Sequence, residues 1–255
     1  MPKKIVVIGG TGLVGSQVIR QLKDHGHEAV SATPGSGADA VTGEGLTDVF
    51  AGADVVVDLS NSPSFADDDV LAFFTASTTN LTAAARAEGV GHYVALSVVG
   101  SRGLPDSGYL RAKVAQEDLI LASGLPYSLV HATQFFEFAG SMAAAGTVDG
   151  EVRLPDALVQ PIASADVATV VARTAAGDPR NGGFDIAGPE ALRFGDFIKV
   201  ALESVGDDRA IVVDPAAEYF GTRLQERSLV PAENGDAELT PTRFAAWLDA
   251  NTLRV

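Results

Sequence analysis

Three polar residues in the middle of the sequence could together protonate a carbonyl oxygen. Tyr109 and Lys113 form Y-x-x-x-K, and residues four apart share one face of a helix. A tyrosine hydroxyl has a pKa of about 10, and a lysine ammonium one turn away would lower that pKa by stabilising the phenolate. Ser97 ends an apolar run, where its hydroxyl could hold the oxygen that Tyr109 protonates. The alternative is a surface tyrosine at a helix start beside a solvated lysine.

A glycine-rich turn follows the first apolar run. The residues Gly9-Gly10-Thr11-Gly12-Leu13-Val14-Gly15 fit both G-x-G-x-x-G and G-x-x-G-x-x-G. One glycine permits a tight turn, another lets backbone N–H groups approach a pyrophosphate, and a third lets the next helix pack closely. The N-terminus of that helix faces the anion. The turn predicts dinucleotide binding, and a merely structural turn is the alternative. Lys113 could also hydrogen-bond the nicotinamide ribose of the dinucleotide.

The residues after the second apolar run bear on the choice of dinucleotide. An Asp or Glu there would bind the ribose 2′-hydroxyl of NAD, but residues 29–36 contain neither acid and no Arg. The hydroxyls of Ser31, Thr33 and Ser36 could donate to a 2′-phosphate, which favours NADP as cofactor and leaves NAD possible. The alternative is that they are ordinary turn hydroxyls.

These residues need a sheet whose strands end at one edge. Apolar runs predict strands at 5–8, 28–32, 53–59, 92–97 and 127–131, and the segments between them predict helices at 12–23, 67–88 and 109–122. Fully apolar strands separated by helices indicate an α/β, doubly wound parallel sheet that is covered on both faces. Ligands bind such sheets at the carboxyl ends of the strands. A further short strand is expected near residues 40–42.

The pattern loosens after about residue 133. A helix is expected to begin near Phe135, followed by short strands at 152–154 and 159–162, a helix at 164–175, a strand at 184–186 and a helix at 194–205. Phe135, Phe136 and Phe138 could wall an apolar pocket. Helical spacing cannot direct all three to one place, so at least one is expected in the core.

Composition limits the partners. Acidic residues outnumber basic ones 33 to 18, which gives a net charge of −15. Such a surface repels phosphate backbones and anionic membranes, so we expect no nucleic-acid or membrane partner. No run reaches the length of a membrane span, and the four apolar residues 5–8 are too few for a signal peptide. We therefore expect a cytoplasmic protein that acts on a small molecule.

Metal and thiol chemistry find no support in the sequence. The chain has no Cys, which excludes disulfides, thiolate nucleophiles and Cys-ligated metals. Its four histidines do not pair at metal-ligand spacing, so no metal site is expected. His131 ends a strand and could touch a substrate, or it could be a packed strand-end histidine.

Three segments carry a family resemblance. They are the turn Gly10–Gly15, Ser97 followed by Tyr109–Lys113, and Pro126–Val130 leading into Ala132–Phe136. With them the chain resembles an atypical short-chain dehydrogenase/reductase of the NmrA-like group of NAD(P)-binding proteins. The resemblance implies a Rossmann core at residues 1–133, to which 158–187 return, and a small C-terminal α/β substrate lobe at 134–157 and 188–255.

The resemblance also implies positions for the cofactor. The residues that would contact it are Gly9, Gly10, Thr11, Gly12, Leu13 and Val14 at the pyrophosphate, Ser60 and Asn61 on the adenosine side, and Thr133 and Phe135 near the nicotinamide. Relatives often carry a basic residue after the second strand and an Arg where His131 stands. This chain has neither.

The expected function is NADPH-dependent reduction of a small apolar carbonyl or quinone, by a monomer or homodimer. Tyr109 would supply the proton, Lys113 would tune Tyr109, and Ser97 would orient the oxygen. The alternative is a non-catalytic regulatory protein of the NmrA type that senses NADP(H). A nucleotide-sugar epimerase or dehydratase is less favoured, because the C-terminal region is short and has few basic residues.

Overall fold

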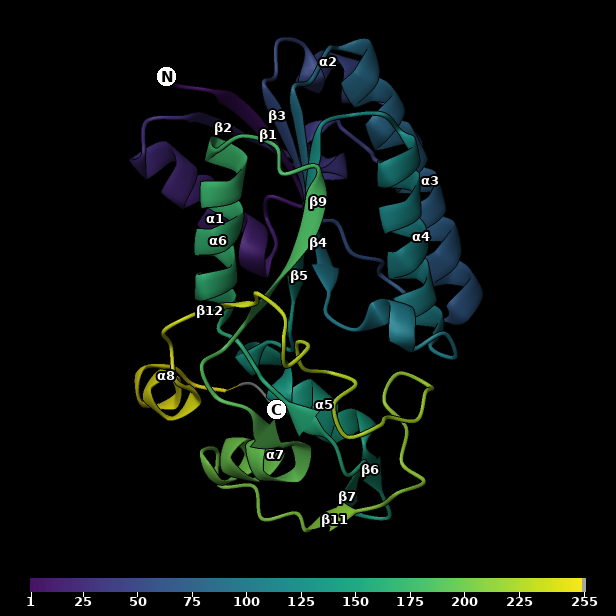
Figure 1. Cartoon of the computed structure of the whole chain (residues 1–255), viewed down its shortest axis with the longest axis vertical. Helices are drawn as coiled ribbons and strands as arrows, with labels where there is room; N and C mark the ends of the chain where they lie inside the picture. The colour runs from purple at the N-terminus through teal and green to yellow at the C-terminus, as the bar shows by residue number, and fades with distance from the viewer. Residues whose placement is uncertain (254–255) are drawn as a thin grey trace. The chain divides into compact units, whose positions relative to one another are not determined.

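Apolar, β-branched runs form the strands of the main sheet (Figure 1). The structure is a computed structural model that describes residues 1–253. The five expected strands are β1 Lys4–Ile8, β2 Glu28–Ala32, β3 Val55–Asp58, β4 His92–Val98 and β5 Tyr127–Ala132. Within residues 1–253 they belong to a seven-stranded sheet in the order β12-β9-β5-β4-β3-β1-β2, with β9 Gly182–Ala187 and β12 Glu238–Leu239.

Parallel pairing brings the carboxyl ends of the first strands to one level. Ile8, the last residue of β1, lies opposite Ala32 of β2 and Asp58 of β3, and each of these is also the last residue of its strand. The glycine-rich turn and the loops after β2 and β3 therefore leave the sheet at the same edge. This edge carries the predicted cofactor residues of the first half of the chain.

Helices cover both faces of this sheet. In Figure 1, α1 (Leu13–Asp24) and α6 (Ser164–Ala176) lie on one side, and α3 (Asp67–Ala87) and α4 (Gly108–Ala122) lie on the other. The short α2 (Leu46–Phe50) was not expected. The fold is the doubly wound, Rossmann-like α/β arrangement predicted from the alternating pattern.

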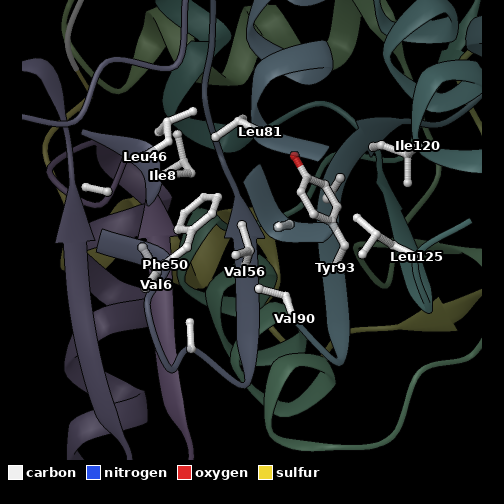
Figure 2. Close-up of a cluster of buried hydrophobic side chains, with 14 of the residues drawn as sticks. Val6, Ile8, Leu46, Phe50, Val56, Leu81, Val90, Tyr93, Ile120 and Leu125 are labelled. Atoms are coloured by element: carbon white, nitrogen blue, oxygen red, sulfur yellow. The ribbon is translucent and has the colours of Figure 1, made fainter. Parts of the chain in front are cut away.

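A buried apolar cluster joins β1, β3 and β4 to α2, α3 and α4. Figure 2 shows Val6, Phe50 and Val56 within this cluster, all of them fully buried. Each such side chain contributes about 1.5–3 kcal/mol when it leaves water. Tyr93 belongs to the same cluster but carries a hydroxyl group, which needs a polar partner in the interior.

The chain divides into two compact units. Unit 1 contains Met1–Ser97, Gly108–His131 and Val167–Phe184, and unit 2 contains Val98–Ser107, Ala132–Asp166 and Asp185–Val255. In unit 2, the strands are β6 Thr147–Val148, β7 Glu151–Leu154, β8 Leu158–Val159, β10 Leu192–Arg193 and β11 Ile211–Val213, and the helices are α5 Ala139–Ala145, α7 Phe194–Glu203 and α8 Phe244–Ala250. None of the helices within residues 1–253 combines the length and apolar character needed to cross a membrane.

The three neighbouring phenylalanines of unit 2 separate as expected. Phe136 is buried, and its ring lies 4.9 Å from that of Phe244 and 5.7 Å from that of Trp247. Phe138 is exposed and stacks on Phe135 at 5.5 Å. One of the three is therefore a core residue, as helical spacing requires.

Two strand predictions need correction. The strand expected near residues 40–42 is wrong, because the Asp39 carboxylate accepts hydrogen bonds from the backbone N–H groups of Val41 (2.7 Å) and Thr42 (3.1 Å) and holds a turn. The strand expected at 159–162 ends instead at Val159. Pro161 has no N–H to donate to a ladder, which limits that strand.

Candidate active site

The glycine-rich turn joins β1 to α1 through positions that exclude a side chain. Gly9 has φ +73°, and a Cβ there would lie 2.7 Å from the carbonyl oxygen of Leu59. A Cβ at Gly15 would lie 2.2 Å from the carbonyl oxygen of Gly9. The first glycine therefore lets the turn pass the end of β3, and the last lets α1 pack on the turn.

The N-terminus of α1 suits an anionic ligand. Gly12 caps the helix without a side-chain hydrogen bond, and no acidic residue stands in the first turn. The first N–H groups of the helix thus have no side-chain acceptor, and the positive end of the helix dipole is not countered locally. Thr11, Gly12 and Leu13 are exposed. These residues fit the pyrophosphate of a dinucleotide.

The loop after β2 uses its hydroxyl groups locally. Ser36 Oγ donates to the carbonyl oxygen of Thr33 at 2.9 Å and accepts from the Thr33 N–H and Oγ1 groups. Because a hydroxyl has one proton, Ser36 has none left for a 2′-phosphate in this arrangement. Ser31 differs, since its Oγ is buried without a hydrogen-bond partner among residues 1–253. It also lies 2.6 Å from the position of a Cβ on Gly10.

A buried carboxylate follows β3. Asp58 Oδ1 accepts from the Ser60 N–H at 3.0 Å and the Ser60 hydroxyl at 2.6 Å. Its Oδ2 accepts from the Tyr93 hydroxyl at 3.0 Å and from Gln116 Nε2 at 2.8 Å. Burial, reinforced by the Asp58 charge, raises the pKa of Tyr93 well above its ordinary value. Sequence reasoning missed Asp58 and Gln116, although a charged residue at the end of an apolar strand was a signal.

Tyr109 stands in the first turn of α4. Its hydroxyl donates to Asn61 Oδ1 at 3.4 Å, and its ring lies 5.5 Å from Phe65 and 6.4 Å from Phe74. Burial raises the pKa of Tyr109 to about 12. The structure thus brings together Tyr109 and Asn61, which sequence reasoning placed at different parts of the cofactor.

Lys113 points into the protein interior. It is 4% exposed, and Nζ donates to the carbonyl oxygen of Leu96 at 2.9 Å and to Gln116 Oε1, and lies 4.4 Å from the centre of the Phe74 ring. Burial lowers the pKa of Lys113 to about 8, against the attraction of Asp58 and Glu117. That Lys113 lowers the pKa of Tyr109 stays a prediction, and in this structure burial shifts that pKa upward.

Ser97 is paired with a carboxylate that sequence reasoning missed. Ser97 Oγ donates to Glu117 Oε1 at 2.5 Å, and His131 Nε2 lies 3.4 Å from the same oxygen. Glu117 follows Lys113 by four residues, so Y-x-x-x-K-x-x-x-E places all three on one face of α4. That spacing was the available signal. The structure gathers Ser97 and His131 around Glu117.

The predicted nicotinamide residues belong to unit 2. Thr133 Oγ1 donates to the carbonyl oxygen of Gln160 at 2.6 Å. Phe135 pairs with Ile162 through the backbone in addition to stacking on Phe138. Between them, the amide of Gln134 is buried with no hydrogen-bond partner among residues 1–253. No group of His, Asp or Glu within residues 1–253 is arranged to hold a metal ion.

Comparison with known proteins gives a family match. Residues 9–179 match the profile of a family described as NAD(P)H-binding. This range contains the glycine-rich turn, Tyr109 and Lys113. It also contains the end of β5, where His131 belongs to unit 1 and Ala132 to unit 2. No curated protein sequence matches the chain.

Solved structures share the fold at low sequence identity. A dTDP-4-dehydrorhamnose reductase ortholog from Clostridium acetobutylicum is 19% identical, with a TM-score of 0.70 over 89% of each chain. A UDP-glucose 4-epimerase from Thermus thermophilus, in complex with NAD, is 17% identical, with a TM-score of 0.67 over 89% of this chain and 90% of that one. A short-chain dehydrogenase/reductase superfamily protein from Agrobacterium tumefaciens, with bound NAD, is 16% identical, with a TM-score of 0.64 over 82% and 85%.

Proposed function

Because the chain belongs to the NAD(P)H-binding family, we propose that it is an NADPH-dependent reductase of a small, apolar carbonyl or quinone. The exposed, uncapped start of α1 would hold the pyrophosphate. Ser60, fixed by Asp58, would line the adenosine side. The cofactor supplies a hydride when bound, and NAD remains possible in its place.

The preference for NADP rests on the end of β2. Residues 29–36 contain no acid that would bind a ribose 2′-hydroxyl and repel a 2′-phosphate. The Ser31 hydroxyl is buried near Gly10 without a partner among residues 1–253, and it would have to turn outward to donate to a 2′-phosphate. Replacing Ser31 by Ala should weaken NADPH binding more than NADH binding, and equal losses would contradict this preference.

The position of Tyr109 carries the proposed chemistry. Its hydroxyl is protonated at neutral pH, as an acid requires, and a nearby positive charge would have to counter the burial that raises its pKa to about 12. Tyr109 stands at the start of α4, beside Asn61 in the loop that follows β3. The ammonium of Lys113, one turn later, would favour negative charge on a nearby oxygen through its field.

Turnover of NADPH tests the proposal. Purified protein would be screened for substrate-dependent NADPH oxidation with quinones, aldehydes and ketones. Replacing Tyr109 by Phe should lower kcat about 10²–10⁴-fold and leave NADPH affinity unchanged, because general-acid help has this magnitude. Tyr127→Phe is the matched control, since Tyr127 begins β5 at the opposite end of the strand from His131. Equal turnover of the Tyr109 variant and the wild type would overturn the assignment.

The contacts of Lys113 favour a second candidate, a regulatory protein that senses NADP(H) without turning over a substrate. All three N–H donors of an ammonium have a destination here, in Leu96, Gln116 and the Phe74 ring. A sensor would bind NADP⁺ and NADPH with different affinities and would oxidise no NADPH in the substrate screen. Calorimetric titration with each form separates the two candidates.

The remaining parts of the proposal concern setting and assembly. Unit 2 would bind the substrate, with Thr133 and Phe135 near the nicotinamide. The protein would act in the cytoplasm as a monomer or homodimer. Light scattering after size-exclusion chromatography would measure its mass in solution.

A further inference from the structure

The groups around Lys113 hold its ammonium in the protein interior. Its Nζ donates to Leu96 and Gln116 and faces the Phe74 ring, and the residue is 4% exposed. A proton that leaves the neighbouring site cannot be replaced through Lys113 unless one of these contacts breaks. A reductase that consumes one proton in each turnover needs another route.

A chain of three side chains leads from the interior toward solvent. Ser97 is buried and donates to Glu117 at 2.5 Å. The Glu117 side chain is 5% exposed, and His131, whose Nε2 lies 3.4 Å from the same carboxylate oxygen, is 20% exposed. Ser97 and Glu117 are thus equally buried, and His131 is the partly exposed member of the three. Ser97 and His131 lie near the carboxyl ends of β4 and β5, and Glu117, on α4, contacts both.

The glycine in β9 makes room for this arrangement. A Cβ at Gly183 would lie 2.5 Å from His131 Cε1, so any other residue would displace the imidazole. Because residue 183 is a glycine, the His131 ring can stay 3.4 Å from Glu117.

The order of the groups suits proton transfer and not nucleophilic attack. In a serine hydrolase the histidine contacts the serine and the carboxylate orients the histidine. Here the carboxylate lies between the two, so the histidine does not contact Ser97 as it would in that arrangement. The two buried acids have separate partners: Asp58 is joined to Lys113 through Gln116, and Glu117 lies beside Ser97 and His131.

We propose that Ser97, Glu117 and His131 form a second proton route to the substrate oxygen that Tyr109 serves, an inference that rests on the proposed reductase. The carbonyl carbon accepts the hydride of NAD(P)H, and the carbonyl π pair moves to oxygen. As the new O–H bond forms, the Ser97 O–H bond breaks, and Ser97 Oγ takes up a proton that the Glu117 carboxylate passes on. That proton comes from the imidazolium of His131, and water reprotonates His131. Only NAD(P)H is oxidised.

The first test measures the link between Glu117 and His131 without any substrate. NMR titration of the imidazole signals, assigned with His131→Gln, compares the wild type with Glu117→Gln and Asp118→Asn. Glu117→Gln keeps an acceptor for Ser97 but removes the charge, so His131 should titrate about one pH unit lower. Asp118→Asn removes the same charge from the exposed side of α4 and should leave His131 unchanged. An unmoved His131 signal in Glu117→Gln, or an equal shift in both variants, overturns the route.

The second test uses the reductase reaction. Two parallel routes predict that Glu117→Gln has a small effect on kcat while Tyr109 is present. In the Tyr109→Phe background, the same change should lower the residual kcat by about 10²-fold with KM unchanged, since it removes the remaining proton supply. Adding Ser97→Ala should then cause no further loss, because both changes interrupt one route.

The outcomes separate this route from the proposed function. If Tyr109→Phe lowers turnover but Glu117→Gln has no effect in that background, the route is wrong and the reductase stands. If no substrate oxidises NADPH, the reductase is wrong, whatever His131 does in the titration. If Asp118→Asn matches Glu117→Gln in the Tyr109→Phe background, the loss reflects general damage to α4 and the route is wrong.

Discussion

Replacing Gly15 by Ala has two opposing effects on the stability of the protein. Ala is favoured over Gly inside a helix by about 1 kcal/mol, so α1 alone would gain stability. The added Cβ would lie 2.2 Å from the Gly9 carbonyl oxygen, 2.8 Å from Gly10 Cα and 2.9 Å from the Gly9 carbonyl carbon. All three contacts are backbone atoms, which cannot rotate away, and the helix or the turn must shift by about 1 Å to restore ordinary contact distances.

The clash should outweigh the helix propensity. Overpacking of this kind costs about 1–3 kcal/mol, so after the gain in helix propensity the net loss in unfolding free energy should reach up to about 2 kcal/mol. Tm should fall by about 2–4 °C per kcal/mol in a chain of this size. Because the shift moves the first N–H groups of α1, NADPH affinity should fall at least about tenfold, which corresponds to about 1.4 kcal/mol.

Urea unfolding and NADPH titration measure these two effects. Gly195→Ala is the matched control, because Gly195 also lies early in a helix, α7, but its Cβ would meet two side chains and no backbone, Ile211 at 3.3 Å and Val213 at 3.9 Å. That variant should be neutral or slightly stabilised and should bind NADPH normally. A Gly15→Ala protein that is as stable as the Gly195→Ala protein, or that keeps wild-type NADPH affinity, would refute the packing argument.

Two further predictions concern the buried charges. The pKa of Lys113 is lowered to about 8 in the folded protein, so the unfolded chain binds the proton more tightly. The stability of the wild type should therefore rise from about pH 8 to pH 10. Urea unfolding at several pH values should show no such rise for Lys113→Met, and an identical rise in both proteins would contradict the prediction. Replacing Asp58 by Asn removes the charge that four donor groups share and should cost about 3–5 kcal/mol, whereas Tyr93→Phe, which removes one of those donors, should cost about 1.5–3 kcal/mol. Equal losses in chemical unfolding would show that the Asp58 charge is unimportant.

The fold could be predicted where local pattern and burial agree. Strand β2 begins and ends where expected, because an apolar run there is bounded by Gly26 on one side and by Pro34 on the other. Local pattern failed where a single side chain decides the backbone, as Asp39 does in the turn that replaces the expected strand. The two-residue strands β10 and β12 depend on pairing with β8 and β9 across long stretches of chain, which no short window of sequence reports.

For the candidate site, the sequence could predict which residues share a helix face but not where their side chains end. The spacing of Tyr109 and Lys113 places both on one side of α4, but it does not fix where a side chain with four rotatable bonds ends. The Leu96 carbonyl, Gln116 and the Phe74 ring decide that question, and they come from three different elements. Asp58 and Glu117 were missed because a single acid is unremarkable in a chain with 33 of them.

The acidic composition and an anionic dinucleotide are compatible because the acids near the site are already neutralised locally. Asp58 is surrounded by four donor groups and joined to Lys113, and Glu117 accepts from Ser97 and faces His131. The first turn of α1 contains no acid, so the positive end of its dipole would act on the pyrophosphate at close range. The acidic groups elsewhere on the surface are farther from the pyrophosphate, and salt screens their repulsion. It follows that raising the salt concentration should strengthen, and not weaken, dinucleotide binding, because salt screens the long-range repulsion from a net charge of −15 more than it screens contacts within the first turn. Binding of NADPH that weakens steeply with salt would instead indicate a basic side chain at the phosphates and would contradict the placement of the cofactor on this turn.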